Sequence, residues 1–395
     1  TDFLARNNYI CSRKMKITSK HILTGIYASG LALLMLLVLY VMDITGFSTE
    51  GEVKLLKYIN IAEQILKSDD TPVPEDVLLI NVNYDKTLVP VHDEFGVPMG
   101  RTDITDREKL LQFLQAAEKN GNYKYILLDI FFEKGYSTPF DSLLFHQIAG
   151  MPRIVIPKHR GRILADSILL PKAAYADYRT DIEESGFVKY PLFVKNEATL
   201  AAVMYEDLYD RKLESHLLYA KDGRKLMHKS IFPTLDLSNI QDYGKDRSKN
   251  ILNLSEDLLS LGQYGMLEEM LDGKYLIIGA FHEKDIHATF RGDVPGCLIH
   301  FNVFLSLAKG KHCIRAISVI FLWSVFFLMS INCLTGKNLF NPKSRLLTIL
   351  LSWLNYSIIL AVICVISYIC FHSVFNILIV ATAFELLKQL IHLKK

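Results

Sequence analysis

Hydrophobic residues gather in four long runs near the two ends of the chain, and shorter runs alternate with polar positions between them. The first long run, residues 22–42, contains 21 residues without a charge. At about 1.5 Å per helical residue, this length matches a hydrocarbon core of roughly 30 Å. Three more runs follow, and only the last is charged: residues 316–334, residues 346–371, and residues 373–393 with Glu385 and Lys388. The pattern predicts four transmembrane helices, one before and three after a long, more polar segment.

Lys and Arg residues beside these runs predict the orientation of the chain. They are frequent in residues 1–21, between the second and third runs, and at the last two positions, whereas the connection at His372 has none. Because cytoplasmic flanks are enriched in Lys and Arg, we expect both termini in the cytoplasm. Residues 1–21 are then a cytoplasmic segment. Residues 43–315 form a periplasmic or extracellular domain, and the first run is a retained anchor, too long for a signal-peptide core.

Short hydrophobic runs typical of buried strands alternate with helical spacing within this domain. Strands are expected at residues 75–82, 123–132, 153–157, 186–194 and 274–280. Helices are expected at residues 105–119, 141–148, 198–208 and 299–307, the first of them capped by Thr105 with Glu108 three positions on. This alternation favours an α/β domain with a mostly parallel sheet. Residues 209–270 are polar and irregular, and we interpret them as a structured insertion.

Several polar residues stand at or beyond the carboxyl ends of these strands, where parallel sheets hold their ligands. The candidates are Asp85, Arg101, Asp129, Asp285, His300 and Asn302. Two interpretations remain open. The residues form a ligand site, or they form an internal hydrogen-bond network that ties loops to the sheet. We favour the network, because nothing in the sequence fixes the directions of the side chains.

Two features of the hydrophobic runs suggest contacts inside the membrane. Glu385 and Lys388 are costly there, so they either reach the headgroups as a pair or couple to a partner protein. Gly25, Ser29 and Ala32 form a face of small residues on the first run. Such a face lets helices approach closely, either within this chain or in a homo-oligomer.

Composition excludes several classes of protein. There are 44 Lys and Arg against 42 Asp and Glu, so a net charge of +2 does not indicate a nucleic-acid partner. Six Cys without a CxxC pair exclude a disulfide scaffold, although a bridge between Cys297 and Cys313 stays open. His282 and His287 are five positions apart, whereas a zinc-protease helix needs four. We therefore expect no metal and no cofactor.

The order of the motifs resembles the second type of CHASE-group sensory domain, which occurs in bacterial receptors with an anchor before it and three membrane helices after it. The segments that carry the resemblance are VLLINVNYDKTL (77–88), FGVPMGR (95–101), ILLDIFF (126–132), SGFVKYPLFV (185–194), GKYLIIGA (273–280) and PGCLIHFN (295–302). The resemblance implies an extracytoplasmic α/β sensory domain in a protein of the bacterial inner membrane. Members usually continue into an output domain, and no such motif is visible here, so a separate signalling partner is expected.

Three classes of function follow. A sensory or receptor-like subunit is our main interpretation: the outer domain binds a ligand or protein, and the membrane helices signal to a separate effector. A structural membrane scaffold in a larger complex is the alternative. An enzyme is not expected, because no set of nucleophile, base and orienting residue is visible.

Overall fold

The structure is a computed structural model that describes residues 19–44, 54–61, 74–92, 95–178, 189–237, 251–263, 265–282, 285–335, 345–371 and 374–393. Contacts divide the chain into two compact units. The helical unit comprises Thr1–Val41, Arg315–Phe371 and Phe375–Lys395, and the α/β unit comprises Met42–Ile314 and His372–Val374. The sequence also predicts a helix over residues 50–68 that continues from the first run. Residues 54–61 are helical, and residues 50–53 and 62–68 lie outside the described residues.

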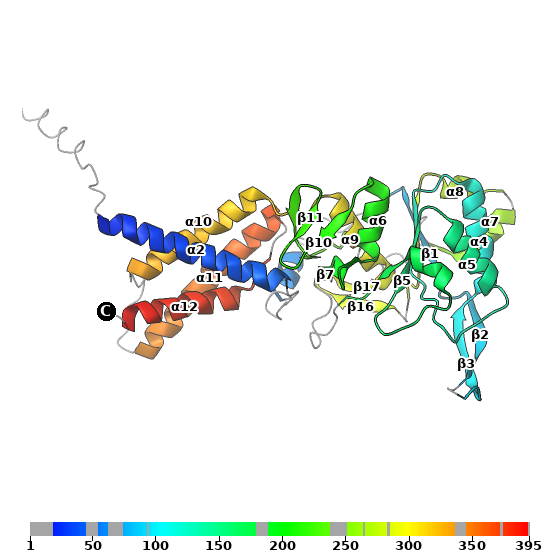
Figure 1. Ribbon diagram of the computed structural model, residues 1–395, viewed down its shortest axis with the longest axis horizontal. Coiled ribbons are helices and arrows are strands. Elements are labelled where there is room, and N and C mark those ends of the chain that lie inside the picture. Colours follow the sequence, from blue (N-terminus) through cyan, green and yellow to red (C-terminus); the bar gives the residue numbers. More distant parts are fainter. Residues whose placement is uncertain are drawn as a thin grey trace, which may run out of the picture. The chain divides into compact units, whose positions relative to one another are not determined.

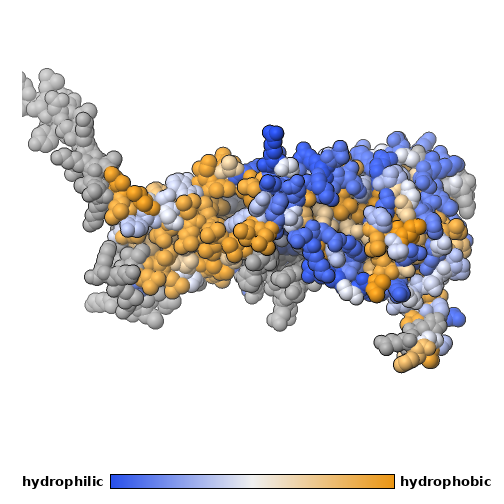
Figure 2. All heavy atoms as spheres, in the orientation of Figure 1, coloured by the Kyte–Doolittle hydropathy of each residue, from blue (hydrophilic) through white to orange (hydrophobic). Residues whose placement is uncertain are grey.

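The helical unit contains α2 (Ser19–Ile44), α10 (Ala316–Thr335), α11 (Arg345–Phe371) and α12 (Ile377–Leu393). Three of its segments are long and apolar enough to cross a membrane: His21–Met42, Ala316–Thr335 and Leu354–Phe371. Hydrophobic residues cover these helices in Figure 2. The fourth predicted span is not shown, because α12 has only 17 residues and includes two charges. The described residues therefore support three candidate spans.

A six-stranded parallel sheet forms the centre of the α/β unit, with the order β14-β1-β15-β4-β5-β6. Its strands are β1 (Val77–Asn81), β4 (Tyr125–Leu128), β5 (Ile154–Lys158), β6 (Ala173–Tyr175), β14 (Ile251–Asn253) and β15 (Tyr275–Gly279). The central strands are runs of buried aliphatic residues, as expected for a sheet that is covered on both faces. The predicted mostly parallel sheet is confirmed.

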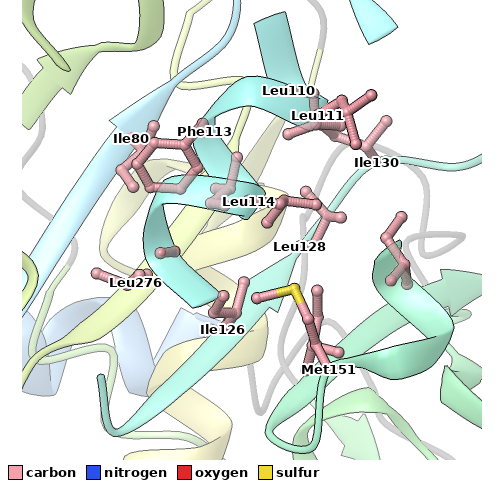
Figure 3. Packing of buried hydrophobic residues seen from close by; sticks show 14 of the residues in the cluster. Ile80, Leu110, Leu111, Phe113, Leu114, Ile126, Leu128, Ile130, Met151 and Leu276 are labelled. Atoms are coloured by element: carbon pink, nitrogen blue, oxygen red, sulfur yellow. The ribbon is translucent and has the colours of Figure 1, made fainter. Parts of the chain in front are cut away.

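Helices pack against both faces of the sheet, and the ribbon diagram labels several of them (Figure 1). Ile80, Ile126 and Leu276 pack with Phe113 in one core beneath α4 (Arg107–Asn120), α5 (Asp141–Gly150) and α8 (Leu267–Leu271), as Figure 3 shows. On the other face, α6 (Leu200–Tyr209) contacts β5, and α9 (Gly296–Ala308) contacts β15. Burial of a side chain such as Phe113 contributes about 2–3 kcal/mol, so this core fixes the sheet and the loops at its edge.

Several local predictions were wrong in detail. Asp106, and not Thr105, caps α4, because its carboxylate accepts hydrogen bonds from the backbone N–H groups of Glu108 and Lys109. The stretch 209–270 is more than an insertion, since β14 extends the main sheet from it. The expected strand 186–194 is two short strands outside the main sheet, β7 (Tyr190–Pro191) and β8 (Phe193–Val194), and its first three residues lie outside the described residues.

A β-hairpin of β2 (Lys86–His92) and β3 (Pro98–Thr105) was not anticipated from the sequence, and it projects from the α/β unit in Figure 1. The sequence pattern here is broken by Pro and Gly, which hid the pairing. The remaining elements are short: β9 (Glu197–Ala198), β10 (Leu213–Ser215), β11 (Ala220–Asp222), β12 (Lys225–Met227), β13 (Ser230–Ile231), β16 (Ile286–Thr289), β17 (Gly292–Pro295), η1 (Ser167–Lys172), η2 (Leu254–Leu259) and α7 (Ser260–Gln263).

Candidate functional site

A pocket of about 520 Å³ opens at the carboxyl edge of the parallel sheet. Residues that follow five of the strands line the pocket: Val82 after β1, Ala280 after β15, Asp129 after β4, His159 after β5 and Tyr178 after β6. Open parallel sheets bind ligands at this edge, because strand ends and the following loops converge there. The pocket is therefore our candidate site.

Asp129 is the acidic residue at the centre of the strand ends. Its backbone N–H donates to Ile278 O at 2.8 Å, which fixes the residue beside β15. Among the described residues, none donates a hydrogen bond to its carboxyl group, which lines the pocket. Burial and the nearby carboxylate of Asp285 raise the pKa of Asp129 well above its ordinary value. Such a carboxyl group is available to a ligand rather than committed to the protein.

Asp285 lies opposite a glycine that gives it space. A Cβ atom added to Gly296 would lie only 2.4 Å from Asp285 Oδ2, so a larger residue at this position would displace the carboxylate. Gly296 N also donates to Asp285 O at 2.9 Å. His287 Nε2 lies 2.9 Å from Asp285 Oδ1, and the side chain of Asp285 is 38 % exposed. Asp129 and Asp285 thus form a pair of neighbouring carboxyl groups on the pocket wall.

His300 on α9 closes the inner side of the pocket. Tyr190 Oη lies 2.6 Å from His300 Nδ1, and the rings of Tyr190 and Tyr178 meet the imidazole edge to face. Burial, together with His159 and His287, lowers the pKa of His300 to about 3. The imidazole is therefore neutral at pH 7 and offers a ligand a polar but uncharged edge.

Arg107 supplies a buried positive charge that sequence analysis did not single out. It lines the pocket at the start of α4, its side chain is 3 % exposed, and its guanidinium stacks 4.3 Å above the Phe132 ring. Asp141 Oδ1 is 3.8 Å from Nε, and among the described residues neither Nε nor Nη1 finds a hydrogen-bond partner. Burial lowers the pKa of Arg107 to about 10, so it stays charged at pH 7. The only sequence signal was an Arg directly after a helix cap.

Three of the six predicted residues do not reach the pocket. Asp85 is buried and accepts hydrogen bonds from Ser255 and from Lys109 Nζ at 3.0 Å, so it ties η2 to α4. Arg101 is exposed on the β2–β3 hairpin. Asn302 is fully buried on α9 and bonds to backbone groups. These three residues match the network interpretation or lie apart, whereas Asp129, Asp285 and His300 meet in one cavity.

The charged pair in the helical unit is buried. Glu385 and Lys388 on α12 are 6 % and 5 % exposed. Gln389 Nε2 donates to Glu385 Oε1 at 2.8 Å, whereas Oε2 has no hydrogen-bond partner in the part of the chain that the structure describes. Lys388 Nζ lies 5.7 Å from the centre of the Tyr356 ring. Ala32, from the face of small residues on α2, is fully buried, which fits packing within the chain.

The pocket combines a pair of carboxyl groups with a buried guanidinium. A cation or a hydrogen-bond donor complements the carboxyl pair, and an anion or carbonyl oxygen complements Arg107. Within the described ranges, the ligand atoms of this pocket do not form a cluster tight enough for a metal ion. No disulfide joins Cys297 and Cys313, so the structure does not contain the bridge that the sequence left open.

Comparison of the chain with protein-family models, with curated proteins and with solved structures gives no match. The resemblance to the CHASE group therefore stays a prediction from sequence motifs. Function has to be inferred from the pocket itself.

Proposed function

We propose that the chain is a receptor-like sensory subunit whose α/β unit binds a small molecule carrying an ammonium group. The supporting observation is the carboxyl pair of Asp129 and Asp285 on the wall of a pocket at the carboxyl edge of a parallel sheet. An ammonium group between the two carboxyl groups relieves their mutual repulsion, which makes binding selective for cations. Arg107 Nη1, which makes no hydrogen bond to the part of the chain that the structure describes, suits an anionic or carbonyl group elsewhere on the same ligand.

The proposal includes a route for the signal. A ligand shifts a conformational equilibrium only through different affinities for the two states. Loops that follow five strands form this pocket, so closure around a ligand changes their positions together. The same α/β unit continues directly into α2 and α10, which we place in a bacterial inner membrane with the α/β unit on the periplasmic side. A separate effector protein reads the change in the membrane helices.

Thermal unfolding with charged probes tests the binding step. The full chain in detergent is heated with putrescine, an aliphatic diamine, or with acetate. Putrescine is expected to raise the melting temperature, since a ligand at 100 times its Kd adds about 2.7 kcal/mol. The shift should disappear in Asp285→Asn and persist in Glu268→Gln, which changes an exposed carboxylate away from the pocket. A shift with acetate alone, or an equal putrescine shift in Asp285→Asn, contradicts the proposal.

The signalling step has its own readout. Cys370 is an exposed thiol on α11. Its rate of labelling by a maleimide should change when putrescine binds, and Cys370→Ser shows which part of the signal belongs to this residue. If putrescine binds but the labelling rate of Cys370 stays the same, the α/β unit binds the ligand without changing the membrane helices, and the signalling step is contradicted.

A structural scaffold is the second candidate, because the β2–β3 hairpin carries exposed apolar residues. Leu88, Phe95 and Met99 are 63 %, 89 % and 68 % exposed. Exposed apolar side chains on a projecting arm are typical of protein docking. Replacement of Phe95 and Met99 by Ser should release a docked subunit from the complex purified at native level, whereas a sensor would keep its response to putrescine.

A further inference from the structure

A second cluster of polar side chains lies away from the pocket, in the last part of the α/β unit. It consists of Asp222, His312 and Cys313, whose ligand atoms all lie within 4.8 Å of one another. His312 Nε2 is 3.0 Å from Asp222 Oδ2 and 3.5 Å from Cys313 Sγ. Asp222 and His312 are buried, and Cys313 is half-buried. The cluster is therefore largely shielded from solvent, and Cys313 is its most exposed residue.

The fold holds these residues on a small antiparallel sheet. Asp222 ends β11, and β12 pairs with it in the order β10-β11-β12. The segment after α9 adds to β12, because His228 N donates to His312 O at 2.8 Å and Ile314 N donates to Leu226 O at 2.9 Å. Backbone pairing on both sides thus fixes the three side chains before any ion binds.

The contacts do not form a catalytic relay. In a Cys–His–Asp relay, the thiol and the carboxylate bind different nitrogens of the imidazole. Here both meet at Nε2 of His312, and its buried Nδ1 has no hydrogen-bond partner within the described ranges. Convergence of oxygen, nitrogen and sulfur on one point is instead the arrangement around a metal ion. The proton of a metal-bound imidazole would then lie on Nδ1, where no other donor among the described residues points at this nitrogen.

The distances fit a tetrahedral ion. Zinc bonds of about 2.3 Å to sulfur and about 2.0–2.1 Å to nitrogen and oxygen place the ligand atoms about 3.3–3.6 Å apart. The separation of 3.5 Å between Nε2 and the thiol lies within this range, and the separation of 3.0 Å between Nε2 and the carboxylate is about 0.3 Å shorter than its lower limit. A thiolate with an imidazole favours Zn²⁺ over Mg²⁺ or Ca²⁺, which prefer oxygen ligands.

We propose that Asp222, His312 and Cys313 bind Zn²⁺, with a water molecule as the fourth ligand. This site departs from the sequence expectation of no metal. Binding replaces the thiol proton of Cys313, which passes to solvent, and involves no change of oxidation state. Arg211 Nη1 lies 3.1 Å from Asp222 Oδ2 and competes with the ion, but its side chain is half exposed and free to turn toward solvent.

The position of the site in the chain gives zinc a regulatory role. Ile314 and Arg315 alone separate Cys313 from the first residue of α10. An ion that joins this segment to β11 fixes the start of the membrane helix that follows the α/β unit. Zinc binding therefore sets the stiffness of the connection through which the α/β unit reaches the membrane.

Metal binding to the full chain tests the proposal directly. The protein is purified in detergent without a polyhistidine tag and dialysed against Zn²⁺, and bound metal is counted by mass spectrometry. Wild type should hold one more ion than His312→Gln or Cys313→Ser, with affinity lowered more than about 100-fold in the variants. Co²⁺ in place of Zn²⁺ should give a thiolate charge-transfer band that Cys313→Ser removes.

Matched controls separate this site from other His and Cys residues. Cys370→Ser removes an exposed thiol and His216→Gln an exposed imidazole beside the same small sheet, and both should bind as wild type does. Arg211→Gln removes the competing cation and should bind Zn²⁺ at least as tightly. Equal metal content in wild type and Cys313→Ser, or a cobalt spectrum without the thiolate band, overturns the proposal.

Discussion

Asn302 on α9 holds Leu237 by both of its backbone polar groups. Leu237 N donates to Asn302 Oδ1 at 2.9 Å, and Asn302 Nδ2 donates to Leu237 O at 3.0 Å. The same amide also donates to Leu298 O at 2.8 Å. All of these groups are buried, so one side chain secures a loop to the helix. A residue that the sequence offered as a ligand contact thus has a structural role.

Asn302→Ala should destabilise the α/β unit by about 3 kcal/mol. The substitution leaves the backbone N–H and C=O of Leu237 buried without partners, at about 1–3 kcal/mol each. Thermal unfolding in detergent measures the loss. Asn122→Ala, which removes an exposed hydrogen bond to Asp272, should change stability by less than about 0.5 kcal/mol. Equal losses of stability for the two substitutions would show that the hydrogen bonds between Asn302 and Leu237 do not stabilise the α/β unit.

Asp129→Asn should change how stability depends on pH. The pKa of Asp129 is raised in the folded state, so the folded protein binds more protons than the unfolded one above pH 3.8. Its contribution to stability is present below that pH and is lost as the pH rises through the folded pKa. Asp129→Asn does not titrate, so its stability does not fall in this way. The free energy of unfolding of the variant should therefore increase relative to that of wild type as the pH rises. If stability depends on pH in the same way in both proteins across this range, the pKa of Asp129 is not raised by folding.

His300→Gln should show a pH effect of opposite sign. The folded pKa of about 3 lies below the ordinary 6.5, so wild type loses stability as the pH falls through this window. The loss approaches about 1.4 kcal/mol per pH unit between the two values. Gln also accepts a hydrogen bond from Tyr190, so the variant keeps the contact and lacks only the titration. The stability difference between the proteins should thus grow in favour of the variant from pH 6.5 downward.

Gly296→Ala should destabilise the protein through Asp285. The added Cβ would meet Asp285 Oδ2 at 2.4 Å, and relief requires that the carboxylate or the start of α9 moves. Overpacking of this kind costs about 1–3 kcal/mol. In an Asp285→Ala background, the same substitution should cost much less, because the clashing atoms are absent. Additive effects in this double-mutant cycle would place the cost elsewhere.

Sequence patterns predicted the architecture of the site better than its members. The parallel sheet followed from runs of buried aliphatic residues, and Asp129 followed from its place directly after β4. His300 and Asn302 were both candidates, yet they are two positions apart on α9 and so point about 200° apart around the helix. Only one of them can face the pocket. Without a known rotation of the helix, the sequence could not choose between them.

Arg107 is a pocket residue that the sequence did not single out. The sequence predicts only that Arg107 lies in the first turn of a helix, and nothing local marks it as a candidate binding residue. Its role comes from burial beneath a pocket whose other walls lie far away in the sequence, such as Asp285 and Tyr178. The β2–β3 hairpin was missed for a related reason, because its Pro and Gly residues look like a loop until the two strands are paired.

The place of β1 in the sheet has a consequence for synthesis of the protein. Both of its neighbours, β14 and β15, are far later in the chain, and Asn81 meets Asn253 across 172 residues. At 5–20 residues per second, the ribosome needs roughly 10–30 s to supply that partner. Throughout this interval, the apolar segment VLLIN has no strand to pair with. Nascent chains therefore pass through an aggregation-prone stage, and a chaperone that shields β1 should raise the yield of folded protein.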